Sequence, residues 1–276
     1  MSYEHGTWRL LITPPGSGAW NMAVDEALLS SVYQGSSPAT LRLYAWEPAC
    51  LSIGYAQPIR DVDLARLTER GWELVRRPTG GRAIMHTDEL TYSVIAQNDE
   101  PRLLGGVLHS YQSISQALLH AMHSLGIPAQ SSQEADLTGN SDPSGPVCFE
   151  VPSPYEIIAY GKKLIGSAQA RKREGVLQHG SLPLYGDLAR ITQVLSYENE
   201  RERNLAAARL LERAATVAQI LGEGITWETA SQAFVESFSL VLNLNLQPQG
   251  LSTLESVAAK RLVAEKYSHP AWSKRV

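Results

Sequence analysis

The sequence predicts an α+β fold, with strands in the middle of the chain and helices on either side of them. Strand patterns follow one another between residues 40 and 96 and again between 155 and 184, whereas the pattern beyond residue 187 is helical. Several of these strands are spaced as hairpins, and strands do not alternate regularly with helices. A doubly wound parallel sheet requires that alternation, so the pattern favours the α+β class.

The first third of the chain begins with a strand and a helix. Residues 8–13 carry the strand pattern, which stops at Pro14-Pro15-Gly16, and Ser17 is the expected cap of the helix that follows. The elements expected next are neighbouring strands over 40–46 and 50–55, a charged helix over 61–70 that ends at Gly71, and strands over 73–77, 82–86 and 90–96.

The rest of the chain predicts a hairpin between helical regions. A long helix over 107–125 precedes a loop over 128–147 that is rich in Ser, Gly, Pro, Asp and Gln. The segments expected after it are a hairpin of 155–160 and 163–170 with its turn at Gly161, a strand over 176–184, and helices near 204–222, 227–243 and 251–266. The chain shows no internal repeat.

Composition excludes several classes of partner. The 276 residues are enough for one large domain or two small ones, and 43% hydrophobic with 19% charged residues is ordinary for a globular protein. The formal net charge of -4 gives no whole-molecule attraction to nucleic acid or to an anionic membrane. Because neither a signal-peptide pattern nor an apolar run of about 20 residues is present, we expect a cytoplasmic protein without a membrane partner.

The two cysteines differ in their surroundings. Cys50 adjoins an apolar strand and is expected to be a small buried hydrophobe. Cys148 follows a turn-rich stretch and stands fifteen positions before Lys163, which a strand and a turn can fold back towards it. A thiol is a nucleophile only as its thiolate, and a nearby ammonium lowers the thiol pKa. Local features alone leave a buried and a reactive Cys148 equally open, and they predict no disulfide framework and no metal site.

A second candidate for chemistry is Arg76-Arg77-Pro78-Thr79-Gly80-Gly81-Arg82-Ala83. Paired glycines allow a close approach of the backbone to a ligand and expose N–H donors, and arginines bind carboxylate, phosphate or carbonyl oxygen. The alternative is a hairpin turn with solvated arginines, which local physics slightly favours.

Two further stretches remain open between a ligand site and an ordinary strand. If Lys163 opens a strand, then Ile165, Ser167 and Gln169 share its face, and Gly166 with Ser167 leaves room for an extended ligand. The alternative is a turn with a solvated lysine. His179 and His86 are interpreted as polar strand residues that line a pocket rather than as acid–base groups. No phosphate loop, dinucleotide fingerprint or nucleophile elbow is present.

Taken in order, these stretches resemble the lipoate/biotin protein ligase superfamily, and most closely its cysteine-dependent protein octanoyltransferases. The similarity extends from about residue 8 to 185. The motifs that carry it are Asn21-Met22-Ala23-Val24-Asp25-Glu26-Ala27, Arg76-Arg77-Pro78-Thr79-Gly80-Gly81-Arg82-Ala83, Glu89-Leu90-Thr91-Tyr92-Ser93, Cys148-Phe149, Gly161-Lys162-Lys163-Leu164-Ile165-Gly166-Ser167-Ala168 and Gln178-His179-Gly180-Ser181.

The resemblance implies a ligase-like catalytic domain with a mixed, mostly antiparallel sheet flanked by helices. It implies that this domain covers 1–248, with a core over about 33–248, and that 249–276 form a helical extension. By the same resemblance Cys148 carries octanoyl as a thioester, and Lys163 lowers the thiol pKa and orients the acyl carbonyl. The substrate-binding residues it implies are Arg77, Gly80, Gly81, Arg82, His86, Gly166 and Ser167.

The resemblance also implies the partners. The donor is acyl carrier protein with octanoyl on its phosphopantetheine, and the acceptor is the lysine of a lipoyl carrier domain, either the glycine cleavage H protein or an E2 subunit. No further cofactor and no metal are expected, and we expect a monomer. One departure from the family pattern concerns the residue after His86, where an Asp is expected and the chain has Thr87 followed by Asp88.

Three other functions remain open at this point. An ATP-dependent lipoate–protein ligase usually carries a third consecutive glycine where this chain has Arg82, needs no nucleophile at Cys148, and often has an accessory C-terminal domain. A lipoyl or octanoyl amidotransferase between carrier domains uses the same Cys–Lys pair. A non-enzymatic acyl-carrier-binding protein is the alternative from a different class.

Overall fold

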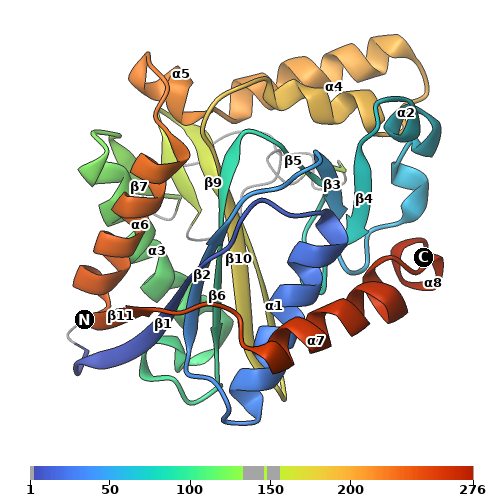
Figure 1. The fold of residues 1–276 in the computed structure, drawn as a ribbon. Helices are drawn as coiled ribbons and strands as arrows, with labels where there is room; N and C mark the ends of the chain where they lie inside the picture. Colours follow the sequence, from blue (N-terminus) through green and yellow to red (C-terminus); the bar gives the residue numbers. More distant parts are fainter. Residues whose placement is uncertain (1–2, 133–145, 148–155, 276) are drawn as a thin grey trace.

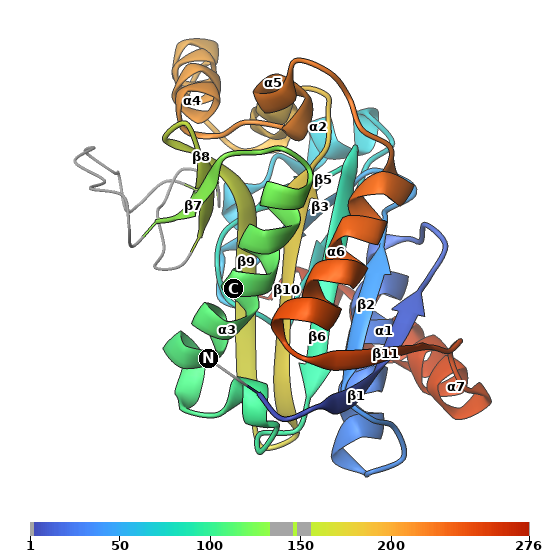
Figure 2. The same cartoon turned by 90° about the vertical axis from the view of Figure 1, so that its left-hand side faces the viewer.

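A computed structural model describes residues 3–132, 146–147 and 156–275. It is built around a large mixed sheet, with a layer of helices on each face and a smaller sheet beside one end (Figures 1 and 2). Within the described residues the large sheet has the strand order β11-β1-β2-β6-β10-β9-β8-β7, and the small one has the order β4-β3-β5.

The strands of the large sheet are β1 (Gly6–Ile12), β2 (Thr40–Tyr44), β6 (Glu89–Ala96), β7 (Ala129–Ser131), β8 (Ile157–Ala159), β9 (Lys162–Lys172), β10 (Gly175–Pro183) and β11 (Leu244–Pro248). β1 runs parallel to β2 and to β11, whereas the other neighbours in this sheet are antiparallel. The expected α+β fold with a mixed, mostly antiparallel sheet is therefore confirmed.

Helices cover both faces of this sheet. α1 (Gly18–Tyr33) and α7 (Thr253–Leu262) lie on one face, and α3 (Gly106–Ser124) and α6 (Trp227–Val241) lie on the other (Figure 2). The remaining α-helices are α2 (Leu64–Glu69), α4 (Glu200–Arg213), α5 (Val217–Leu221) and α8 (Pro270–Ser273), and a 3₁₀ helix spans Leu188–Val194. Ser17 caps α1 as expected, because its side chain accepts a hydrogen bond from the Trp20 N–H.

The small sheet corrects two expectations about neighbours. β3 (Cys50–Ile53) pairs with β4 (Glu73–Arg76) and β5 (Ile84–His86), so it does not lie beside β2. β3 lies between β4 and β5 in this sheet. Residues 77–83 therefore form a loop that passes over the end of β3, and they are not a hairpin turn between adjacent strands. The predicted helix near 204–222 is also wrong as one element, because Thr216 begins a new capping box and divides it into α4 and α5.

The hairpin of β8 and β9 contains a bulge that changes which way Lys163 faces. Tyr160 and Gly161 both have positive φ, of 49° and 74°, as a tight hairpin turn requires. Ile158 pairs with Lys163 but Ile157 pairs with Ile165, so Leu164 is an extra residue on β9. Paired residues share a face of the sheet, and Lys163 is therefore on the opposite face from Ile165, not on the same face as expected.

Candidate functional site

The loop between β4 and β5, residues 77–83, is held in shape by its own first arginine. Arg77 is buried and donates to the backbone carbonyls of Gly80, at 2.8 Å, and Arg82, at 2.7 Å, and to the Ser52 hydroxyl at 3.1 Å. The loop also packs tightly on Gly54, where a Cβ atom would stand 1.8 Å from the Gly81 carbonyl oxygen. The interpretation of Arg77 as a solvated arginine is therefore wrong.

Gly80 and Gly81 present backbone donors to solvent. Both residues are exposed, and within the described part of the chain neither backbone N–H has an acceptor. Gly81 has a φ of +85°, which glycine adopts without strain, and a Cβ on it would lie 4.0 Å from the Cβ of Ala168 on β9. The pair can therefore offer N–H groups to a ligand oxygen beside β9.

A narrow cavity with a volume of about 20 Å³ lies between this loop and the large sheet. Of the predicted site residues it brings together Arg77, His86 and Gly166. Its apolar lining comes from Met22, Tyr44, Trp46, Ile84 and Ala168, and its other lining residues are Ser52, Thr91, His179, Gly180 and Ser181. Ser167 is not among them, because its hydroxyl bonds the Tyr92 hydroxyl at 2.8 Å, and Tyr92 packs with α6 on the other face.

His86 is fixed from three sides. Its ring stacks on Trp46, with 3.8 Å between the ring centroids, its Nε2 lies 2.7 Å from the Ser52 hydroxyl, and its Nδ1 lies 2.7 Å from Glu89 Oε1. Asp88, the acidic residue nearest to the position where the family pattern has an Asp, pairs with Arg190 at 2.8 Å. Glu89 is thus the carboxylate that orients His86, a role that the sequence analysis did not assign.

The stability of the protein should depend on Glu89 in acid. Burial would raise the pKa of Glu89, but the charge of His86 and hydrogen bonds from His86, Thr91 and Ser181 hold the pKa below its ordinary value. A carboxyl group with a lowered folded pKa stabilises the fold above its unfolded pKa of about 4.3, and this contribution is lost as pH falls through the folded value.

We therefore expect Glu89→Gln to have a lower free energy of unfolding than the wild type at pH 7. Between pH 7 and pH 3, the free energy of unfolding should fall less in Glu89→Gln than in the wild type. Urea unfolding at the two pH values measures both changes. Glu223→Gln, at an exposed carboxylate in the loop between α5 and α6, is the control and should change neither. Equal acid sensitivity of Glu89→Gln and the wild type would contradict the prediction.

Lys163 is buried and forms an ion pair with Glu156. Glu156 lies two residues before Ile158, which pairs with Lys163, so the ion pair and the bulge agree on the face to which the lysine points. The solvated lysine of the alternative interpretation is excluded by this burial. The sequence offered no signal for Glu156, because a single carboxylate before a short strand is common.

Cys148 lies outside the described residues, so the structure gives no distance between Cys148 and Lys163. The two residues before it are described: the Pro146 carbonyl accepts from the Ala83 N–H at 3.0 Å and from Gln57 Nε2 at 3.1 Å, and Val147 is bridged to Ala83. The chain that leads to Cys148 is thus attached to the end of the 77–83 loop.

Cys50 is a structural thiol, as expected. It is fully buried in β3, and a Cβ atom added to Gly18 would lie 2.3 Å from its sulfur. Burial raises the pKa of the Cys50 thiol well above its ordinary value, and the carboxylates of Glu73 and Glu89 raise it further. Cys50 is therefore held as an unreactive thiol.

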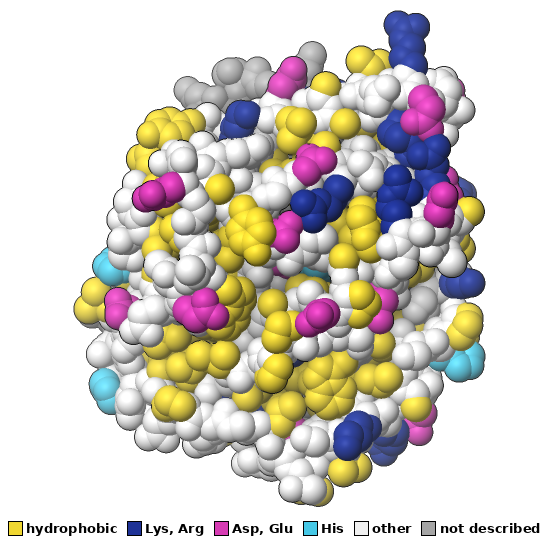
Figure 3. Space-filling view, turned by 45° about the horizontal axis from the view of Figure 1, so that its top comes forward, with side chains coloured by type: hydrophobic (Ala, Val, Ile, Leu, Met, Phe, Trp, Pro, Cys, Tyr) yellow, Lys and Arg dark blue, Asp and Glu magenta, His cyan; other side chains and the backbone are white. Residues whose placement is uncertain are grey.

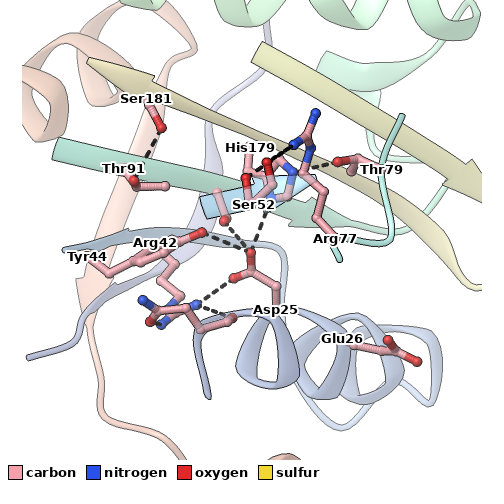
Figure 4. Close-up of polar contacts among 12 residues, drawn as sticks. Asp25, Glu26, Arg42, Tyr44, Ser52, Arg77, Thr79, Thr91, His179 and Ser181 are labelled. Atoms are coloured by element: carbon pink, nitrogen blue, oxygen red, sulfur yellow. Dashed lines mark hydrogen bonds and ion pairs between the residues drawn. The ribbon is translucent and has the colours of Figure 1, made fainter. Parts of the chain in front are cut away.

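A buried polar network, which the sequence analysis did not predict, joins α1 to the cavity. Figure 4 shows Asp25 of α1 with Arg42 and Tyr44 of β2 on one side and His179 of β10 on the other. Beyond His179 lies Thr79 of the 77–83 loop. The only sequence signal for this network was the presence of Asp25 and His179 in motifs that matched the family.

The face of the molecule displayed in Figure 3 carries charges of both signs. Figure 3 shows Lys and Arg side chains gathered towards one edge of the face it displays, with Asp and Glu among them. Arg66 of α2 and Glu200 of α4 form one such pair of opposite charges. Among the described residues no helix combines the length and hydropathy that a membrane span requires, and no group of three acidic, His or Cys side chains is arranged to hold a metal ion.

Comparison with known proteins gives three findings. The model of the lipoyl protein ligase A/B catalytic domain matches residues 17–239. An octanoyltransferase LipM from Kyrpidia tusciae is 41% identical over 98% of this chain and 99% of its own length, and one from Brevibacillus brevis is 38% identical over 97% and 99%.

Solved structures give the same fold. A bipartite lipoate protein ligase described with its E2 lipoyl domain from Thermoplasma acidophilum superimposes with a TM-score of 0.81 at 24% identity, covering 98% of this chain and 97% of that one. A lipoate-protein ligase A bound with ATP superimposes with a TM-score of 0.78 at 25% identity, covering 97% and 98%. These similarities come from both transferases and ligases, so the chemistry depends on the residues at the site.

Proposed function

Because the chain belongs to the lipoyl protein ligase A/B catalytic domain family, we propose that it is an octanoyltransferase of lipoate biosynthesis. The observation that carries this function is the 41% identity with an octanoyltransferase over nearly the whole length of both chains. We propose acyl carrier protein as the donor and a lipoyl carrier domain, either the glycine cleavage H protein or an E2 subunit, as the acceptor. The enzyme acts in the cytoplasm as a monomer without a cofactor, through a catalytic domain over 1–248.

The apolar lining of this cavity is the proposed site of the octanoyl chain, and the cavity has to widen beyond about 20 Å³ to admit that chain. Met22, Tyr44, Trp46, Ile84 and Ala168 give it an apolar lining. Burial of an alkyl chain contributes about 0.8 kcal/mol per CH₂, so full burial of the seven carbons beyond the carbonyl contributes about 6 kcal/mol. This energy is large enough to favour octanoyl over chains that are shorter by several carbons.

The thioester carbonyl is placed at the mouth of this cavity. The exposed N–H groups of Gly80 and Gly81 are the proposed donors to its oxygen, where negative charge develops during attack. The thiolate of Cys148 attacks the carbonyl carbon, a new C–S bond forms, and the phosphopantetheine thiolate leaves. The neutral amine of the acceptor lysine then attacks the enzyme thioester, a C–N bond forms as the C–S bond breaks, Cys148 leaves as a thiolate, and the amine proton passes to water.

Lys163 supports both steps as a fixed positive charge. Its ammonium favours the Cys148 thiolate over the thiol and so lowers the thiol pKa. Glu156 fixes the position of that ammonium through the ion pair. The amide product is more stable than either thioester, so the transfer needs no ATP.

Two related enzymatic functions differ from this one in their donor. A lipoate–protein ligase would bind an adenylate beside the glycines, where Arg82 replaces the third glycine of the ligase pattern. An amidotransferase would take octanoyl from one carrier domain and pass it to another. The donor from which the enzyme accepts octanoyl distinguishes these functions from the proposed one.

The test is intact-protein mass spectrometry after incubation with one donor at a time. Octanoyl–acyl carrier protein is expected to add one octanoyl group that hydroxylamine removes. Loading from an octanoylated carrier domain, but not from acyl carrier protein, would favour the amidotransferase. Pyrophosphate release from lipoate and ATP would favour the ligase, and acyl carrier protein binding without any loading would leave only a binding protein.

A further inference from the structure

A chain of polar contacts also joins the 77–83 loop to helix α1. It begins at the fully buried carboxylate of Asp25. Asp25 accepts hydrogen bonds from Arg42 Nη1 at 2.7 Å, from the Ser93 hydroxyl at 2.8 Å and from the Tyr44 hydroxyl at 3.2 Å. Burial would raise the pKa of Asp25, but the charge of Arg42 and the contact with His179 hold the pKa below its ordinary value. Asp25 is therefore an ionised carboxylate with a fixed orientation.

His179 continues this chain from α1 to β10. Its Nδ1 lies 3.5 Å from Asp25 Oδ2, at the outer limit of a hydrogen bond, and its Nε2 lies 2.7 Å from the Thr79 hydroxyl. Burial lowers the pKa of His179, and Asp25 offsets this only in part. The ring is therefore neutral at pH 7, and the negative charge of Asp25 favours the tautomer with its proton on Nδ1.

With the proton on Nδ1, Nε2 accepts a hydrogen bond from the Thr79 hydroxyl. Thr79 is buried, and its carbonyl also accepts from the Tyr55 N–H at 2.8 Å. Tyr55 thus holds the backbone of Thr79 and His179 holds its side chain, at the position directly before Gly80 and Gly81. Arg77 holds two carbonyl groups of the loop in place. The contact between Thr79 and His179 instead holds the residue that directly precedes the Gly80 and Gly81 N–H groups.

We propose that Asp25, His179 and Thr79 form a hydrogen-bonded chain that positions the Gly80-Gly81 donors for acyl transfer. Asp25 and Thr79 are positioning residues, because neither lines the cavity, and His179, which does line it, acts in this chain through its contact with Thr79. Their role follows from geometry: residues from α1, β10 and the 77–83 loop contact one another in succession inside the protein (Figure 4). The proposal rests on octanoyl transfer as the function, because it concerns the donors to the thioester oxygen.

The test compares two substitutions at Thr79. Thr79→Val keeps the shape and removes the hydroxyl, whereas Thr79→Ser keeps the hydroxyl. Because misplacement of a catalytic group by about 1 Å can cost about 100-fold, we expect Thr79→Val to lower kcat for octanoyl loading by about 10- to 100-fold. KM for octanoyl–acyl carrier protein should stay near the wild-type value, since Thr79 is buried. Thr79→Ser should restore most of kcat.

A matched control separates positioning from general loss of stability. Thr192→Val removes another buried threonine hydroxyl, which donates to the Ala189 carbonyl in the 3₁₀ helix Leu188–Val194. It should lower the melting temperature about as much as Thr79→Val and leave kcat unchanged. Equal kcat values for Thr79→Val and Thr79→Ser would overturn the proposal.

A spectroscopic measurement tests the chain without any substrate. The ¹⁵N chemical shifts of the His179 ring should report an Nδ1–H tautomer in the wild type and a changed Nε2 shift in Thr79→Val. An Nε2–H tautomer in the wild type, or identical spectra, would overturn the proposal. If the wild type fails to load octanoyl, the proposed function fails instead, and the ring spectra still decide whether the chain exists.

Discussion

Cys148→Ser is expected to abolish octanoyl loading from octanoyl–acyl carrier protein while leaving the protein folded. A serine hydroxyl is not ionised near neutral pH, even beside an ammonium, so the variant lacks the nucleophile that thioester exchange requires. Removal of a catalytic nucleophile commonly costs at least about 10³-fold in kcat. Intact mass spectrometry measures the loaded fraction over time, and circular dichroism with thermal unfolding shows whether the fold is retained.

Cys50→Ala is the matched control, because Cys50 is the other thiol of the chain and is fully buried. It should load octanoyl at the wild-type rate and lose some stability, since the removed sulfur packs against Gly18. Loading of Cys148→Ser at the wild-type rate would remove the covalent intermediate from the mechanism. If Cys50→Ala fails to load octanoyl while its fold is intact, the acyl group is carried by Cys50 and not by Cys148.

The fold could be predicted from the sequence because its hydrophobic patterns are local. The cap at Ser17, the turn at Gly161 and the long helix α3 each depend on a few neighbouring residues. The place of β3 depends instead on pairing between distant segments, which strand patterns do not encode. The bulge at Leu164 depends on the register between β8 and β9, and a shift of one residue exchanges the two faces of a strand.

Only the part of the candidate site that lies in local sequence motifs could be predicted. The motifs identified Arg77, His86 and Gly166, and the fold brings these three to one cavity. The carboxylates that orient or pair with site residues were not assigned a role, since Asp25, Glu89 and Glu156 become partners only through tertiary contacts. A motif reports which residue types recur, but it does not report that the Arg77 side chain holds its own loop.

Lys163→Met is expected to raise the pKa of the Cys148 thiol by about one unit or more, because an opposite charge nearby shifts a pKa by about 1–3 units. The direction follows from charge: the ammonium favours the thiolate, so its removal favours the neutral thiol. Octanoyl loading at pH 7 should fall accordingly and recover in part at higher pH. The rate of iodoacetamide alkylation across pH, measured in the Cys50→Ala background, gives the titration midpoint.

The same substitution should destabilise the protein, because it removes the Lys163 ammonium from the buried carboxylate of Glu156. Loss of one member of a buried ion pair costs about 3–5 kcal/mol, and the double variant Lys163→Met/Glu156→Gln should recover much of this loss. The double variant thus keeps the thiol measurement possible if the single variant unfolds. Lys162→Met is the control on the adjacent residue, whose ammonium bonds the Leu211 carbonyl at 2.6 Å, and it should leave the midpoint unchanged. A midpoint in Lys163→Met equal to that of Lys162→Met, or a midpoint in the double variant equal to that of Glu156→Gln alone, would exclude Lys163 as the group that activates the thiol.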